Sequence, residues 1–183
     1  MILVVATAVV LATAWMRGGQ LSRLGALELR SPSLALVAVA VQIVLLSVLP
    51  ASTPWGLAVV VHVGTYGLAL AFVLRNRHVT GVWVLFAGGL TNLVAIAANG
   101  GVMPVNTAAL RAVGRTVASS GFSNTAPAIG AHLGFLGDVI PVPGPYPIGN
   151  VVSIGDLLLV AGAAVLVHRT CVGPITATKT VRP

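Results

Sequence analysis

Five long apolar stretches, none of which contains a lysine or an arginine, constrain the fold of this 183-residue chain more than any other feature. A helix that crosses the hydrocarbon core of a bilayer needs about 20 mostly apolar residues, with about 17–25 typical. The stretches cover approximately residues 2–16, 34–50, 55–74, 81–98 and 151–168. We therefore predict an all-α integral membrane protein, a bundle of five transmembrane helices that forms one membrane domain over residues 1–183.

The composition excludes other classes of protein. Apolar residues make up 57% of the chain before its 21 glycines are counted, and charged residues make up 7%, where about 25% is usual for soluble domains. Disorder requires low hydrophobicity and high charge, so it is excluded. The ten basic residues form no dense run, and the net charge of +7 therefore does not indicate nucleic-acid binding. The partner that this composition predicts is the lipid bilayer.

The basic residues between the stretches predict the orientation, because inner loops are enriched in lysine and arginine. If the N-terminus lies outside, eight basic residues lie on the inner side: Arg17, Arg23, Arg30, Arg75, Arg77, Arg169, Lys179 and Arg182. Only Arg111 and Arg115 then lie outside, within the long segment 99–150 that joins the fourth and fifth helices. We therefore expect the N-terminus outside, the C-terminus inside, and a long structured outer segment.

Two features of the outer segment 99–150 predict its structure. Residues 107–118 have the pattern of a short amphipathic helix, in which Arg111 and Arg115 share one face. Such a face contacts solvent or lipid headgroups, or anchors an anionic group of a substrate. Alternating prolines favour a stiff extended strut near the end of the segment, at Pro141, Pro143, Pro145 and Pro147.

Polar residues inside membrane helices are costly, and they therefore mark either helix contacts or function. In the predicted orientation these residues lie mostly from the middle of the membrane to its outer boundary, which favours an outward-facing polar cavity. His62 and Tyr66 share one helical face, and so do Asn92 and Asn99. The residues predicted to line this cavity, or to bind a ligand in it, are Gln42, His62, Tyr66, Asn92, Asn99, His132 and Ser153.

The chain has only three acidic residues, and two of them, Asp138 and Asp156, fall at the outer boundary. Two neighbouring carboxyl groups share a proton, and such a pair can activate water and protonate a leaving group. Alternatively, Asp156 pairs with one of the outer cations, Arg111, Arg115 or His132. The histidines have neither metal-ligand nor haem spacing, so we expect no metal and no cofactor.

Three motifs resemble a family of small bacterial multi-pass membrane proteins of unassigned function. They are Asn-Gly-Gly-Val-Met-Pro at Asn99–Pro104, Leu-Gly-Asp-Val-Ile-Pro at Leu136–Pro141, and Ser-Ile-Gly-Asp at Ser153–Asp156. The resemblance covers most of the chain. It implies a multi-pass protein of the bacterial plasma membrane and implies nothing about activity.

The C-terminal part is also similar to signal peptidase II, the lipoprotein signal peptidase. That family uses two aspartates at the outer boundary, at a spacing similar to the 18 residues between Asp138 and Asp156. Ser153–Asp156 stands where the family has Asn-x-Ala-Asp, and Gly88–Asn92 is similar to its glycine-rich stretch. The Asp-Arg pair expected after Asn92 is absent, and one helix is extra. This resemblance implies an aspartyl dyad of Asp138 and Asp156.

Three functions follow. The first is an accessory or ligand-binding role that uses the polar cavity, with a small ligand or another membrane protein as partner. The second is an aspartyl-type hydrolase or peptidase, in which Asp138 and Asp156 activate water while Asn92 and Asn99 orient the substrate. The third is a proton-coupled transporter that titrates Asp156 and His62. The apolar inner halves of the helices disfavour transport.

Overall fold

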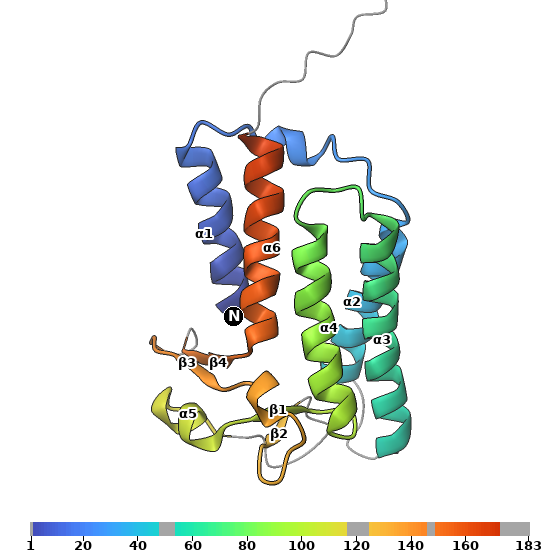
Figure 1. The fold of residues 1–183 in the computed structure, drawn as a ribbon, viewed down its shortest axis with the longest axis vertical. Coiled ribbons are helices and arrows are strands. Elements are labelled where there is room, and N and C mark those ends of the chain that lie inside the picture. Colours follow the sequence, from blue (N-terminus) through green and yellow to red (C-terminus); the bar gives the residue numbers. More distant parts are fainter. Residues whose placement is uncertain (1, 48–53, 117–124, 146–148, 173–183) are drawn as a thin grey trace, which may run out of the picture.

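The computed structural model describes residues 2–47, 54–116, 125–145 and 149–172. Its longer helices run side by side, and a small cap of short strands lies at one end of them (Figure 1). We call this end the cap end and the opposite end the far end. The longer helices are α1 (Ile2–Met16), α2 (Pro32–Ser47), α3 (Trp55–Arg75), α4 (Val82–Ala98) and α6 (Ile154–Cys171).

These five helices lie where the apolar stretches predict them, with small differences at their ends. α2 begins at Pro32, because proline suits the first position of a helix, where no N–H is needed. Its predicted last residues, 48–50, lie outside the described residues. α6 begins at Ile154 instead of residue 151, because residues 150–152 form a strand and Ser153 caps the helix.

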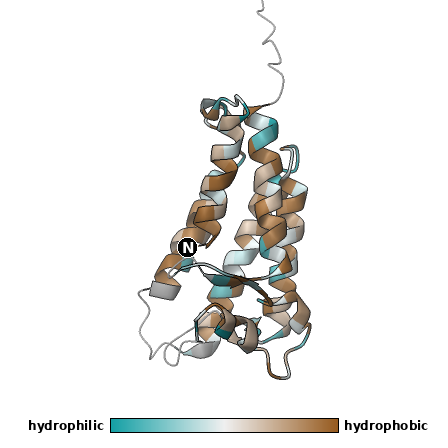
Figure 2. Ribbon diagram, turned by 90° about the vertical axis from the view of Figure 1, so that its left-hand side faces the viewer, coloured by the Kyte–Doolittle hydropathy of each residue, from teal (hydrophilic) through white to brown (hydrophobic). Residues whose placement is uncertain are grey.

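Two of these helices are long and apolar enough to cross a membrane, over Gly56–Arg75 and Ile154–Cys171. The others are shorter apolar helices. Large apolar side chains remain exposed along the bundle, among them Leu36, Val60 and Val4. Figure 2 shows that hydrophobic residues, in brown, occur along the helices. A soluble monomer rarely exposes so much contiguous apolar surface. These features indicate association with a membrane.

The helices pack in the order α1, α6, α4, α3, α2, so that each contacts the next. In Figure 1, α1 lies at one side of the bundle and α3 at the other, with α2 behind α3 and α4. Residues of α1, α3, α4 and α6 line one common cavity at the cap end.

Glycines bring α4 and α6 into close contact. A Cβ atom at Gly88 would lie 2.7 Å from the backbone oxygen of Gly155, and one at Gly162 would lie 2.7 Å from the backbone nitrogen of Leu85. A Cβ atom at Gly155 would collide with the side-chain oxygen of Asn92. The close approach thus places Asn92 beside the first turn of α6.

The cap contains strands, and here the all-α prediction is wrong. β1 (Met103–Val105) pairs in parallel with β2 (Thr125–Pro127), while β3 (Ile140–Val142) pairs antiparallel with β4 (Asn150–Val152). Strands of three residues are too short to show an alternating pattern. Prolines within β1, β2 and β3 further hide them, because proline usually argues against a strand. Pro141 lies in this hairpin and not in the predicted strut, and Pro147 lies outside the described residues.

The predicted helix over 107–118 is also shorter than expected. α5 (Thr107–Ala112) ends in a Schellman motif, in which Gly114 adopts a φ of 70°. The backbone N–H of Arg115 donates to the carbonyl of Leu110 at 3.0 Å, and that of Gly114 donates to Arg111 at 3.0 Å. Arg115 therefore lies beyond the helix and does not share a helical face with Arg111. Residues 117 and 118 lie outside the described part of the chain.

Candidate functional site

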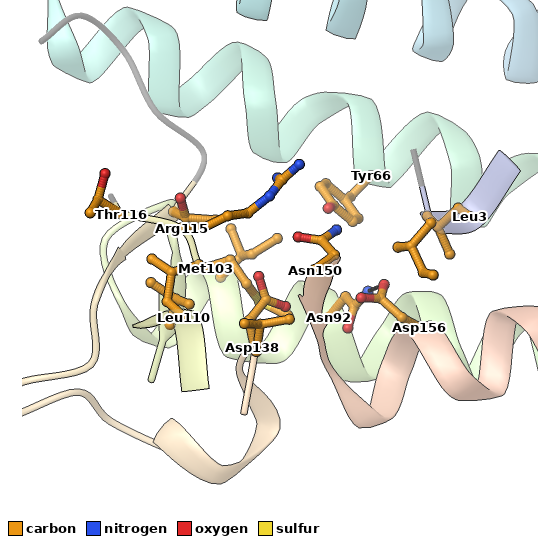
Figure 3. Close-up of a pocket in the computed structure, with 15 residues that line it drawn as sticks. Leu3, Tyr66, Asn92, Met103, Leu110, Arg115, Thr116, Asp138, Asn150 and Asp156 are labelled. Carbon is orange, nitrogen blue, oxygen red and sulfur yellow. Dashed lines mark hydrogen bonds between the residues drawn. The ribbon is translucent and has the colours of Figure 1, made fainter. Parts of the chain in front are cut away.

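A cavity of about 420 Å³ lies where the cap meets α1, α3, α4 and α6, and we call it the cap pocket (Figure 3). The apolar part of its wall includes Ile2 and Leu3 of α1 and Ile96 of α4. The polar residues that line it are Tyr66, Asn92, Arg115, Thr116, Thr125, Asp138, Asn150 and Asp156. The two aspartates are thus brought to one cavity from the cap and from α6, as the sequence suggested.

Asp156 is held in place by its own helix and by α4. It forms a capping box with Ser153, whose hydroxyl accepts from the Asp156 N–H at 2.9 Å while Asp156 Oδ2 accepts from the Ser153 N–H at 3.1 Å. The amide of Asn92 donates to Asp156 Oδ1 at 3.1 Å. The Ser153 hydroxyl in turn donates to the Asn92 oxygen at 2.9 Å. Both carboxyl oxygens of Asp156 therefore have a hydrogen-bond donor.

Asp138 is held through its backbone instead. Its N–H donates to the carbonyl of Pro104 at 2.8 Å, and its carbonyl accepts from the N–H of Asn106 at 2.8 Å. Gly137 permits this approach, because a Cβ atom there would collide with the Pro104 carbonyl. Among the described residues, no group donates a hydrogen bond to the Asp138 carboxyl. Its backbone is fixed while its carboxyl faces the cavity.

Burial, and to a lesser extent the negative charge of Asp156, together raise the pKa of the Asp138 carboxyl from its ordinary value of 3.8 to about 7. At neutral pH the proton of Asp138 is therefore easily gained or lost. The two carboxyl groups differ in environment, since that of Asp156 accepts hydrogen bonds and that of Asp138 accepts none from the part of the chain that the structure describes. Such a difference separates the roles that two carboxyl groups play in binding or in acid–base chemistry.

Of the two cap arginines, only Arg115 lines the cap pocket. In Figure 3 its side chain extends over the cavity toward Tyr66. Arg111 is exposed, and its Nε donates to the carbonyl of Thr107 within its own helix at 3.3 Å. The turn at Gly114 is thus what separates the two arginines and directs one of them to the site.

The structure places Asn99 and His132 together but outside the lining of the cap pocket. The Asn99 amide donates to the carbonyls of Ala95 and His132, each at 2.7 Å, and its oxygen accepts from the His132 N–H at 2.9 Å. These bonds attach the loop to the end of α4. Asn99 and His132 therefore do not line the cap pocket as expected. They have a structural role instead.

Gln42 and His62 lie apart from the cap pocket, between α2 and α3. His62 Nδ1 is 3.1 Å from Gln42 Oε1, and the imidazole packs edge-on against Tyr66 with ring centroids 5.4 Å apart. A second, mostly apolar cavity of about 350 Å³ lies here, which we call the α2–α3 groove. It is lined by Ala38, Val39, Gln42, Ile43, Thr65, Tyr66 and Ala69. Tyr66 therefore borders both cavities.

The three motifs noted in the sequence meet around the cap pocket. Asn99–Pro104 ends α4 with Gly100 and Gly101 at positive φ and begins β1. Within Leu136–Pro141, Asp138 forms a β-bridge with Val105 of β1. Ser153–Asp156 caps α6 and binds Asn92.

The sequence did not indicate two other residues that line the cap pocket. Asn150 and Thr125 belong to short strands, and no local pattern indicated that either faces a cavity. Within the described part of the chain, no cluster of three or more histidine, cysteine, aspartate or glutamate side chains is arranged to hold a metal ion.

This mostly helical fold, with two helices long and apolar enough to span a membrane, defines the class: a helical, membrane-associated protein. The chain belongs to DUF5317, a family of unknown function whose model matches residues 26–168. The matched range includes both aspartates and all three motifs. No curated protein and no solved structure matches the chain. The expected membership of a family without an assigned function is confirmed, whereas no finding supports the resemblance to signal peptidase II.

Proposed function

We propose that this protein crosses the bilayer five times, exposes its cap on the outer face, and binds a small ligand in the cap pocket. The observation that carries the proposal is the convergence of Asp138, Asp156 and Arg115 on one cavity. Ligand pockets are commonly about 300–1,000 Å³, mostly apolar, with a few convergent polar groups. At about 420 Å³ the cap pocket lies within that range of volumes, and its lining is more polar than usual.

The distribution of charge supports the orientation. The far end holds the turn between α1 and α2 and the turn between α3 and α4 (Figure 1). The basic residues in or beside those turns and at the end of α6 are Arg17, Arg23, Arg30, Arg75, Arg77 and Arg169. The cap end has Arg111 and Arg115, while Lys179 and Arg182 lie outside the described residues. By the positive-inside rule, the far end faces the cytoplasm.

Cysteine labelling tests the orientation. Ala108→Cys lies on the exposed face of α5 and His78→Cys lies in the exposed turn after α3, while the native Cys171 is buried. We expect a membrane-impermeant maleimide to label position 108 and to spare position 78 in intact cells. The reverse pattern would overturn the proposal.

A water-soluble carbodiimide tests the pocket, because it adds to protonated carboxyl groups. We expect it to modify Asp138 near neutral pH, since the raised pKa keeps a share of that carboxyl protonated there. Peptide mass spectrometry would locate the adduct, with the exposed Glu28 as an internal reference for reagent activity at low pH. A folded protein in which Asp138 resists modification at every pH would show that the pocket is closed to solutes.

One observation favours a second candidate, an aspartyl-type membrane hydrolase. Two carboxyl groups in different environments line one cavity, which is the arrangement that acid–base hydrolysis requires. Asp138 and Asp156 would hold and activate a water molecule, and Asn92 would position Asp156. The test is cleavage of a mixed peptide library, followed by mass spectrometry. Cleavage that Asp138→Asn and Asp156→Asn each abolish would establish this candidate.

A further inference from the structure

The two cavities of this protein share a wall. The cap pocket is lined by charged and polar groups, the α2–α3 groove is mostly apolar, and Tyr66 borders both. A ligand that filled both cavities would need a polar part and an apolar part on either side of this tyrosine. That is the chemistry of an amphiphile, and a purely polar solute would leave the groove empty.

The groove lies at one end of the succession of packed helices. α2 packs on α3 at the end of the succession, and two groove residues, Val39 and Ile43, are each 58% exposed. In the proposed five-span arrangement this face meets the lipid chains. An apolar ligand part would therefore enter from the bilayer.

The cap pocket offers groups of both charges to a head group. The guanidinium of Arg115 has five N–H donors in a planar fork that suits phosphate oxygens. The Asp138 carboxyl lacks a hydrogen-bond donor among the described residues and accepts from a ligand that carries N–H groups. In Figure 3, Asn150 lies between the two aspartates. A head group with a phosphate and a primary ammonium is complementary to these two groups.

We propose that the ligand of the cap pocket is a phospholipid with an amine-bearing, phosphoethanolamine head group, whose acyl chain lies in the α2–α3 groove. This inference rests on the proposed function. A phosphocholine head has no N–H donor for Asp138, and a phosphoglycerol head has no cation. Both lipids therefore serve as matched comparisons with identical acyl chains.

The test measures binding of these three lipids to the purified full-length chain by native mass spectrometry, with the protein in detergent. We expect the ethanolamine lipid to bind roughly tenfold more tightly than the other two, as one charged hydrogen bond would give. Asp138→Asn should remove this preference. Arg115→Gln should weaken the binding of all three lipids alike, because each carries the phosphate. Equal affinity of all three lipids for the native chain would overturn the inference.

The groove is tested separately with two tryptophan variants of α2. Val39→Trp fills the groove and should weaken the binding of all three lipids. Val37→Trp adds the same bulk at an exposed position outside the groove lining and should leave their binding unchanged. Circular dichroism and size-exclusion elution check that each variant is folded. Equal binding by both variants would contradict a chain in the groove.

Carbodiimide protection separates this inference from the proposed function. The ethanolamine lipid should protect Asp138 from modification, and free phosphoethanolamine at the same concentration should not. If the lipid gives no protection while Asp138 reacts, the lipid inference fails and the pocket proposal stands. If the free head group protects equally, the ligand is a soluble solute and the lipid inference is again wrong. If Asp138 never reacts, the proposed function itself fails.

Discussion

The two ends of the helix bundle use their buried polar side chains differently. At the far end, Asn76 is 1% exposed, and every polar atom of its side chain is occupied. Its oxygen accepts from the Arg30 N–H at 2.7 Å, and its amide donates to the carbonyls of Arg30 at 2.9 Å and of Phe72 at 2.7 Å. At the cap end, Asp138 faces a cavity, and within the described residues no donor bonds to its carboxyl.

This difference distinguishes the part of the molecule that stabilises the fold from the candidate functional site. A buried polar group that is fully bonded stabilises the fold, because leaving its partners unpaired is costly. A carboxyl group that is partly buried without a donor has the opposite effect on stability, and function is one reason for a fold to retain it. The far end therefore holds the helices together, and the cap end is where we expect binding or chemistry.

The largest expected effect is at the far end. Asn76→Ala removes three hydrogen bonds, including those to the N–H and the carbonyl of Arg30, and should lower the free energy of unfolding by about 2–4 kcal/mol. Thermal unfolding in detergent measures it. Gln20→Ala, an exposed substitution at the same end, is the control and should change little. A loss no greater than that of the control would remove the distinction between the two ends.

A smaller effect is expected at the first turn of α6. Ser153→Ala removes the helix cap and the hydrogen bond to Asn92 and should cost about 1–2 kcal/mol. It also removes one of the hydrogen bonds that position Asp156, so ligand binding in the cap pocket should weaken as well. Ser33→Ala, on the exposed surface of α2, is the matched control. Lost stability without any change in binding would make Ser153 part of the scaffold alone.

The third effect has the opposite sign. Because the folded-state pKa of Asp138 is raised to about 7, the folded protein holds this proton more tightly than the unfolded chain does. Stability therefore decreases as the pH rises from about 4 to about 7, where the carboxyl ionises in the fold. Asp138→Asn removes this penalty, and it should be at least as stable as the native chain at pH 8. Melting curves at pH 5 and pH 8 measure the difference, and a variant less stable at pH 8 would show that Asp138 has a structural partner.

Hydropathy alone located the five helices. The result for α1, which runs from Ile2 to Met16 as predicted, shows how direct this signal is. The approach of Asp138 and Asp156 to one cavity was also foreseeable, since both fall at the same end of adjacent segments. Arg115 was recognised only as one of two candidates, because the prediction extended its helix past Gly114.

Other parts of the site were not visible in the sequence. The strands of the cap are three residues long and contain prolines, so they give no periodic signal. His132 and Asn99 have the residue types of a site, yet their hydrogen bonds join a loop to α4. Whether a polar side chain bonds to the protein or faces a cavity depends on neighbours that are distant in the chain.

The sequence by itself determined that this chain is mostly helical and apolar enough to associate with a membrane. That is a local property, because a helix satisfies its own backbone hydrogen bonds and hydropathy is summed over neighbouring residues. Only the tertiary structure decided which polar groups share a cavity. The cap pocket joins Tyr66, Asn92, Arg115, Asp138 and Asp156 from five separate segments. Their meeting depends on the close glycine contact of α4 with α6 and on the bridge of Asp138 to β1, which no single stretch of sequence encodes.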